Sequence, residues 1–197
     1  MFDRIKDNKM TLFKNKYLIE STRLKDWDYS RLGYYFVTIC TKNKEHFLGD
    51  IIGDKMQLSQ IGKMVSDEWQ KTEKVRDYVK LDEWVIMPNH LHGIVIIQNE
   101  NKVESHGHAS QHLNTPSGDA FNASLQRSNL SNVIRGFKSA TFRKIHKKGF
   151  VNFAWQSLFY DHIIRNEKEL HEIREYILYN PLKWQLDEEN QNNKSRK

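Results

Sequence analysis

Two apolar runs that meet at Pro88-Asn89 set the strongest limit on how this chain folds. Residues 84–97 read "WVIMPNHLHGIVII". A proline and an asparagine between runs of β-branched and aromatic residues are typical of a tight turn between two strands. We therefore predict two adjacent strands over 79–99. A two-stranded hairpin is not stable alone in water, so further strands or helices must pack on it.

The remaining elements follow from hydrophobic periodicity. The patterns predict a strand over 34–41, a small hairpin over 46–59, helices over 59–75 and 125–147, a strand over 153–165 and a last helix over 167–179. Pro181 disfavours helical backbone at Asn180, so the last helix is expected to end there. The order is that of a ferredoxin-like split βαβ core with one added helix. We predict an α+β domain with an antiparallel sheet and a C-terminal helix.

Composition divides the chain into a domain and three polar segments. Residues 1–30 are polar and mixed in charge and predict an extended arm, and the domain is expected over 31–184. Residues 98–124 have little hydrophobic pattern, which is typical of a flexible insertion, and 185–197 predict a disordered tail. The insertion carries three histidines that no regular element would position for metal binding: His106, His108 and His112.

Charge and apolar content narrow the function classes. The 197 residues carry a net charge of +6, and the pI is near 9.2, which favours polyanionic partners such as nucleic acid. No apolar run approaches the ~20 residues that span a bilayer. The N-terminus does not resemble a signal peptide. We expect a cytoplasmic, nucleoid-associated protein without membrane contact. The single cysteine, Cys40, excludes an internal disulfide and is expected to be buried in its strand.

His90 and His92 alternate along the second strand of the predicted hairpin. Alternate side chains of a strand share one face, so both imidazoles point the same way while Leu91 faces the core. Two imidazoles ~7 Å apart can converge on one divalent ion. An ordinary pair of surface histidines remains the alternative from this motif alone.

Tyr176 and Asn180 are four residues apart on the last helix and therefore share a face. They lie at the edge of its apolar stripe, where a side chain meets the domain without being sealed inside it. Taken singly, they read as an amphipathic tyrosine and a helix C-terminal residue. Together with the histidines, they offer a phenol nucleophile and an amide oxygen beside a metal that could polarise a phosphoryl oxygen. The sequence has no nucleotide-binding P-loop motif.

The helix over 125–147 has one basic side. Such a side suits a phosphate backbone, and a solvated face remains the alternative. The candidate DNA contacts on it are Arg127, Arg135, Lys138 and Arg143.

Five stretches, in order along the chain, carry a family resemblance. They are "YYFVTICT", "WVIMPNHLHGIV", "IRGFKSA", "WQSLFYDHIIRNEKEL" and "YILYNP". With them the chain resembles the single-tyrosine HUH transposases, and most closely the REP-associated tyrosine transposase (IS200-like) group. The resemblance extends from about residue 20 to residue 184.

The resemblance implies a ferredoxin-like core with His90, Leu91 and His92 as the HUH motif on a central strand. Tyr176 would be the nucleophile, and Asn180 would join the two histidines as the third ligand of Mg²⁺ or Mn²⁺. Such enzymes cut single-stranded DNA, often at hairpins, keep the 5′ phosphate on tyrosine and free a 3′ hydroxyl. A monomer or a homodimer is compatible with this reading.

Other residues have roles in the same expectation. Tyr160 and Tyr179 are rival nucleophiles, although Tyr160 lies in a predicted strand and Tyr179 on another face of the helix. His162 and Arg165 are expected to contact DNA or to support the site.

Two segments depart from the family pattern. The arm matches loosely in "ESTRLKDWDYS", where Arg23 and Lys25 are candidate phosphate contacts. The polar loop over 98–128 would alter access of DNA to the site.

Two other functions are open. The first is a non-catalytic module, derived from a transposase, that binds hairpin DNA or RNA. The second is a hydrolase that uses His90, His92 and a metal-bound water and needs no tyrosine. The joint presence of Tyr176 and Asn180 with the histidines favours the transposase-like enzyme.

Overall fold

The computed structural model describes residues 31–98, 129–186 and 190. Its main sheet contains β1 (Gly33–Cys40), β4 (Val79–Met87), β5 (His90–Ile97) and β6 (Tyr160–Ile164). A separate hairpin pairs β2 (Gly49–Ile52) with β3 (Lys55–Leu58), and the helices are α1 (Gln60–Lys74), α3 (Leu130–Lys147) and α4 (Glu167–Tyr179), with 3-10 helices η1 (Lys42–Lys44) and η2 (Pro181–Leu186). The expected arm and nearly all of the insertion, with Arg23, Lys25, Arg127 and the insertion histidines, lie outside the described residues.

The main sheet has the strand order β4-β5-β1-β6, and every neighbouring pair is antiparallel. This order results when two strand–helix–strand units interleave, as in the split βαβ pattern. The predicted α+β class with an antiparallel sheet is confirmed. Strand β5, which carries the two histidines, is central, between β4 and β1.

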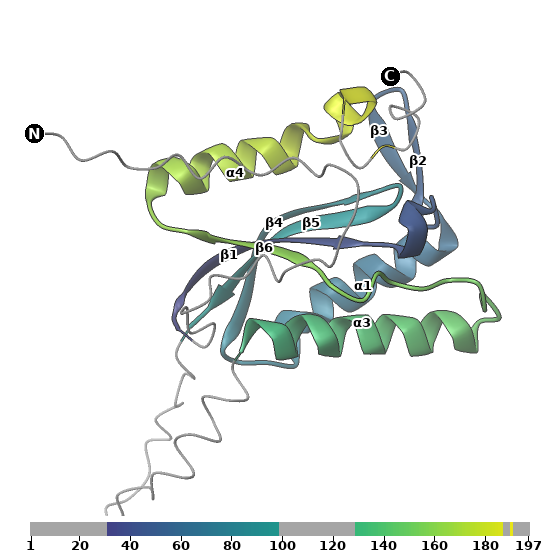
Figure 1. Ribbon diagram of the computed structural model, residues 1–197, viewed down its shortest axis with the longest axis horizontal. Coiled ribbons are helices and arrows are strands. Elements are labelled where there is room, and N and C mark those ends of the chain that lie inside the picture. The colour runs from purple at the N-terminus through teal and green to yellow at the C-terminus, as the bar shows by residue number, and fades with distance from the viewer. Residues whose placement is uncertain (1–30, 99–128, 187–189, 191–197) are drawn as a thin grey trace, which may run out of the picture.

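Helices cover the two faces of this sheet unequally (Figure 1): α1 and α3 lie on one face, and α4 lies across the other. On β5, Leu91, Val95 and Ile97 belong to the larger core beneath α1 and α3. Ile94 faces α4 and belongs to a smaller cluster with residues of that helix. His90 and His92 alternate with Leu91 and therefore share the α4 face with Ile94.

The larger core depends on one close approach at Gly93. A Cβ atom at this position would lie 2.8 Å from Cζ2 of the buried Trp69 and 3.2 Å from Cβ of Trp84. The missing side chain lets the Trp69 ring pack directly on β5. The sheet is thereby fixed to α1 on the strand that carries the histidines.

The expected helices are confirmed, with small shifts at their ends. Ser59 caps α1 by accepting a hydrogen bond from Gly62 N at 3.0 Å, as predicted. Helix α3 begins after its cap residue Asn129, whose side chain accepts from Ser131 N at 2.8 Å. No helix within the described ranges has both the length and the apolar character needed to cross a membrane.

The strand predicted over 153–165 is shorter in the structure. β6 covers only Tyr160–Ile164, and Trp155 makes an isolated bridge to Thr41. The ammonium of Lys138 explains the difference, because it binds the carbonyls of Gln156, Ser157 and Leu158, which are therefore turned toward α3. Apolar composition alone does not reveal this contact from a distant helix.

The end of α4 follows the predicted bounds for a different reason. Asn180 keeps helical backbone, with φ −59° and ψ −42°, although a proline follows it. Pro181 then opens η2, where its fixed φ is compatible with a helical first turn. Helix η2 extends through Leu186, two residues into the segment expected as a tail.

Candidate active site

The two histidines form the centre of a polar site beneath α4. His90 is fully buried and His92 is 4% exposed. Their ring centroids are 4.3 Å apart, and the ring planes meet at 67°. Because the rings turn toward one another, they are closer than the ~7 Å repeat along a strand that the sequence suggests.

Each imidazole makes a hydrogen bond through Nδ1. His90 Nδ1 lies 2.8 Å from Asn89 Oδ1, and His92 Nδ1 lies 2.8 Å from Thr38 Oγ1. The Nε2 atom of each ring therefore faces the space between the sheet and α4. His90 Nε2 is buried and has no hydrogen-bond partner among the described residues, whereas His92 Nε2 lies 3.3 Å from the Tyr176 hydroxyl.

Burial keeps both rings neutral. It lowers the pKa of His92 to about 3. Burial also lowers the pKa of His90 well below its usual range, and the nearby His92, Lys44 and His46 act in the same direction. A neutral imidazole is the form that ligates metal ions.

Tyr176 lies on the site-facing edge of α4 and reaches both protein and solvent. Its ring centroid is 5.2 Å from that of His92 and 6.0 Å from that of Phe36, which stacks on His92 at 5.3 Å. Its side chain is 42% exposed. A phenol in this position can contact a large external substrate while its hydroxyl is directed at the histidines.

Asn180 is one helical turn beyond Tyr176 and is buried. Its Oδ1 is buried, and no residue that the structure describes forms a hydrogen bond with it. Farther along the same segment, the Trp184 ring packs 6.0 Å from the His90 ring. The chain from Tyr176 to Trp184 therefore passes over both histidines, with Asn180 between the two contacts.

The lone-pair atoms of this site are of the kinds that bind a divalent cation. His90 Nε2 and Asn180 Oδ1 are buried acceptors without partners, which is costly in a folded protein unless a ligand satisfies them. His92 Nε2 would complete a set of two imidazole nitrogens and one amide oxygen. Clusters of three or more His, Cys, Asp or Glu side chains are absent from the described part of the chain. A metal at this site therefore depends on the amide of Asn180.

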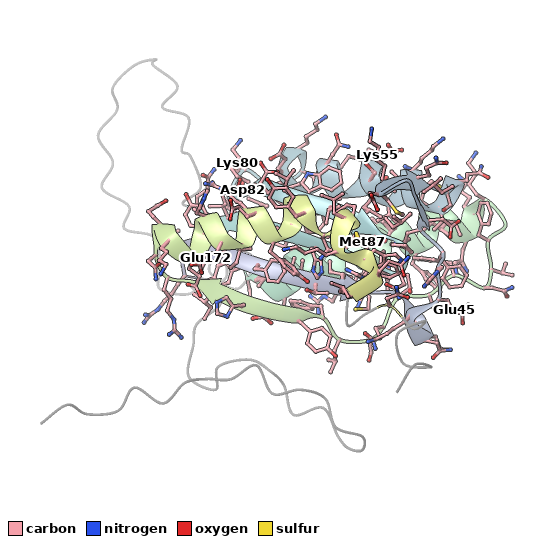
Figure 2. The ribbon with its side chains drawn as sticks, turned by 90° about the horizontal axis from the view of Figure 1, so that it is seen from above. Glu45, Lys55, Lys80, Asp82, Met87 and Glu172 are labelled. Carbon is pink, nitrogen blue, oxygen red and sulfur yellow. The ribbon has the colours of Figure 1, made fainter. Side chains whose placement is uncertain are left out.

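Polar contacts fasten α4 over the site. Near its middle, Arg174 donates through Nη2 to Asp82 Oδ2 on β4 at 2.6 Å; Figure 2 shows Asp82 beside this helix. At its start, Glu169 accepts from His162 Nε2 at 2.6 Å and from Arg165 N at 2.8 Å. His162 and Arg165 were expected at the DNA or in support of the site; His162 lies in the middle of β6 and Arg165 directly after it, and both contact Glu169 in the first turn of α4.

The remaining sequence candidates are spread over other parts of the fold. Arg135 and Arg143 are exposed on α3, where they donate to Asn132 and Ser139 of the same helix. Lys138 is engaged by the carbonyls of 156–158, and its partial burial lowers its pKa to about 8.

The rival tyrosines lie at one edge of the main sheet and at the last residue of α4. Tyr160 is on the edge strand β6, paired in register with Thr38. As the cross-strand partner of Thr38, Tyr160 shares the face of the sheet that carries His92. Tyr179 is 44% exposed.

Sequence reasoning missed Thr38, Asn89 and Trp184. Thr38 is a polar residue within an apolar strand, and Asn89 precedes the histidine motif; both were detectable as unusual positions. Trp184 carried no signal, because it approaches His90 only through the path of η2.

Together, the fold and the site define an α+β protein whose antiparallel sheet carries a histidine pair under a tyrosine-bearing helix. No family model matches the chain. It is 37% identical over 168 residues to an uncharacterised protein of Haemophilus influenzae, and the match covers 85% of this chain and 91% of that one. The chain therefore belongs to the same family as that protein.

Two solved structures are similar to the chain. One is a REP-associated tyrosine transposase bound to a REP hairpin, with 20% identity, a TM-score of 0.44 and coverage of 88% of this chain and 74% of the other. The second is a candidate transposase from Deinococcus radiodurans, with 17% identity, a TM-score of 0.30 and coverage of 79% and 96%.

Proposed function

We propose that this protein is a transposase-like enzyme that nicks single-stranded DNA and transfers the strand through a phosphotyrosine on Tyr176. One observation carries the proposal. The Tyr176 hydroxyl lies 3.3 Å from His92 Nε2, at a site that also holds the unpartnered acceptors of His90 and Asn180. A hydroxyl beside a set of metal-ligand atoms is the arrangement that metal-assisted attack on a phosphate requires.

The reaction exchanges one phosphodiester for another. The Tyr176 oxygen forms a bond to phosphorus, the bond from phosphorus to the DNA 3′ oxygen breaks, and the 5′ phosphate stays on the tyrosine. The phenol proton is balanced by the proton on the released 3′ hydroxyl, so no nucleotide is consumed. In the reverse direction, a 3′ hydroxyl attacks the phosphotyrosine and rejoins a strand.

We assign different roles to the residues on α4 and beneath it. His90, His92 and Asn180 would hold Mg²⁺ or Mn²⁺, which when bound polarises a phosphoryl oxygen. Phe36 packs against His92 and Tyr176 and so maintains their relative orientation. The half-exposed position of Tyr176 admits a polymer substrate.

The sequence resemblance indicates single-stranded DNA with hairpin structure as the substrate. We propose that Arg135 and Arg143 bind its phosphates on the exposed side of α3, and that His162 and Arg165 contact it near the start of α4. We propose no DNA contact for Lys138, because its ammonium binds the carbonyl groups of residues 156–158. Arg23, Lys25 and Arg127 stay predictions outside the described residues.

The test is trapping of the covalent adduct. Labelled single-stranded hairpins are incubated with the protein and Mn²⁺, and the product is resolved on a denaturing gel. We expect an adduct with the wild type and with Tyr179→Phe, a matched control on the same helix. Tyr176→Phe should abolish the adduct while DNA binding, measured by fluorescence anisotropy, persists.

The other outcomes separate the alternatives. An adduct of undiminished yield in Tyr176→Phe overturns the assignment, and its loss in Tyr160→Phe alone would move the nucleophile to β6. Binding across several hairpins without any cleavage would identify a binding module. Cleaved DNA without a covalent intermediate would identify a hydrolase.

A further inference from the structure

The orientation of the Asn89 amide is fixed by the chain around it. Asn89 is fully buried, and its Nδ2 donates to the carbonyl oxygen of Lys44 at 3.1 Å. A carbonyl can only accept, so the amide nitrogen must face Lys44. The amide oxygen must then face His90, where it lies 2.8 Å from Nδ1.

This orientation determines which nitrogen of His90 carries the proton. Asn89 Oδ1 can only accept, so His90 Nδ1 must donate. A fully buried neutral imidazole has one N–H, and that proton is therefore on Nδ1. Nε2 is left with its lone pair directed into the site, where residues 31–98, 129–186 and 190 offer it no hydrogen-bond partner.

The backbone holds Asn89 from two sides. Its carbonyl accepts from Thr41 N at 2.8 Å, and the carbonyl of Pro88 accepts from Leu48 N at 3.0 Å. The Lys44 carbonyl is presented by a tight turn in which Asn43 and Lys44 both have left-handed backbone, with φ of 56° each. Asparagine tolerates such backbone, but it is unfavourable for a lysine and persists at Lys44 only where surrounding contacts fix it.

We propose that Asn89 is a positioning residue that locks His90 in the tautomer with a free Nε2, ready to ligate a cation, and that the Lys44 turn locks Asn89. The consequence for the metal rests on the proposed function; the tautomer itself does not. His92 differs, because its Nδ1 partner is the Thr38 hydroxyl, which can donate or accept. Only one of the two histidines is therefore fixed by an acceptor-only partner.

The tautomer can be read directly in metal-free protein. With ¹⁵N-labelled histidine, long-range ¹H–¹⁵N NMR correlations distinguish a protonated ring nitrogen from one with a lone pair. The His90 signals are assigned by their loss in His90→Gln. We expect wild-type His90 to be protonated at Nδ1 and unprotonated at Nε2. A proton on Nε2 in the wild type overturns the proposal without any variant.

Two substitutions test the role of the amide. Asn89→Ala should move part of the His90 population to the Nε2-protonated tautomer, and Asn89→Asp, which keeps an acceptor for Nδ1, should preserve the wild-type tautomer. An unchanged tautomer in a folded Asn89→Ala protein would contradict the proposal.

Calorimetry with Mn²⁺ alone tests the consequence. We expect Asn89→Ala to weaken binding by about 10- to 100-fold, as is typical when the partner of a ligating histidine is removed. The exposed Asn152→Ala should leave affinity unchanged. A shifted tautomer with unchanged Mn²⁺ affinity would reject the link between the two. Failure of adduct formation alone would reject the proposed function and leave the NMR result intact.

Discussion

Two buried acceptor atoms, Asn180 Oδ1 and His90 Nε2, have no hydrogen-bond partners in the part of the chain that the structure describes. Leaving such a group unpaired costs roughly 1–3 kcal/mol of folding stability. A site that keeps two of them is less stable than an apolar site of the same shape. We interpret this cost as the mark of a ligand site, because a bound cation would satisfy both atoms.

Replacing Asn180 by leucine tests this interpretation. Leucine has the same branching at Cγ, although it is larger, and it lacks the unpaired oxygen, so Asn180→Leu should leave the thermal midpoint without metal unchanged or raised. Mn²⁺ should then give a smaller increase in midpoint than in the wild type, as measured by differential scanning fluorimetry. Equal stabilisation of both proteins by Mn²⁺ would show that the Asn180 amide is not a ligand.

Gly93 tests the packing behind the histidines. Gly93→Ala would place a methyl group 2.8 Å from the Trp69 ring, so the ring or the strand must shift. We expect a loss of about 1–3 kcal/mol in unfolding free energy, measured by urea denaturation, as is typical of overpacked cores. Gly33→Ala is the matched control, since its nearest neighbour would be 3.8 Å away. Equal midpoints for the two variants would contradict this account.

For single residues, the sequence predicts which face of a strand a side chain is on better than it predicts which distant residue that side chain contacts. Strand alternation correctly places His90 and His92 on one face and Leu91, which is fully buried, on the other. It does not predict that Thr38, 54 residues away, contacts His92. Such contacts depend on which strands become neighbours, and local periodicity carries no information about that.

Helix α4 is fastened at its start by reciprocal capping. Asn166 Oδ1 accepts from Glu169 N at 2.9 Å, and the Glu169 carboxylate returns to accept from Arg165 N and from His162. This is a variant of the capping box, in which the side chains of the N-cap residue and of the third helical residue each accept a hydrogen bond from a backbone N–H at the start of the helix. Because the apolar cluster under α4 is small, these polar contacts help to hold the tyrosine over the sheet.

The pH dependence of stability should reveal this cap. Partial burial raises the pKa of Glu169, but the hydrogen bonds from Arg165 and His162 outweigh it and lower the pKa below the ordinary 4.5. A lowered carboxylate pKa stabilises the fold above the unfolded-state pKa, and this contribution is lost as pH falls through the folded-state value. Urea midpoints of wild type and Glu169→Gln should therefore differ at pH 7 and converge below pH 4.5. A gap that widens on acidification would contradict this sign.

Element prediction succeeded where capping and periodicity acted locally, as in α1 and α4. It failed at the start of β6, because residues 153–159 are kept out of the strand by contacts with Lys138, which lies on α3. It also gave the right end of α4 for a wrong reason, because Pro181 was compatible with helical backbone at Asn180.

The whole molecule has two chemically different sides. The histidine pair lies on the α4 face of the sheet, and the opposite face is covered by α1 and α3 (Figure 1). The 18 residues of α3 include no aspartate or glutamate, and its Arg135 and Arg143 are exposed. Lys144 of the same helix is instead paired with Asp67 and Glu68 of α1.

This difference among the basic residues predicts the salt dependence of DNA binding. If Arg135 and Arg143 contact phosphates, replacing both by glutamine should reduce the slope of log affinity against log salt by roughly 1.4, or about 0.7 per charge for single strands. Lys144→Gln, which removes an already paired cation, should change the slope much less. Fluorescence anisotropy over a salt series gives both values, and equal effects of the two changes would reject this surface.

The contact between Tyr176 and His92 joins two parts of one polypeptide. Within one copy, the described residues already bring Tyr176 and His92 together, so we propose that the tyrosine acts on the histidines of its own chain. We therefore expect the proposed activity to depend to first order on protein concentration, down to dilutions at which any pair would separate. Two inactive variants, one lacking the phenol and one lacking the imidazole, would not restore each other when mixed.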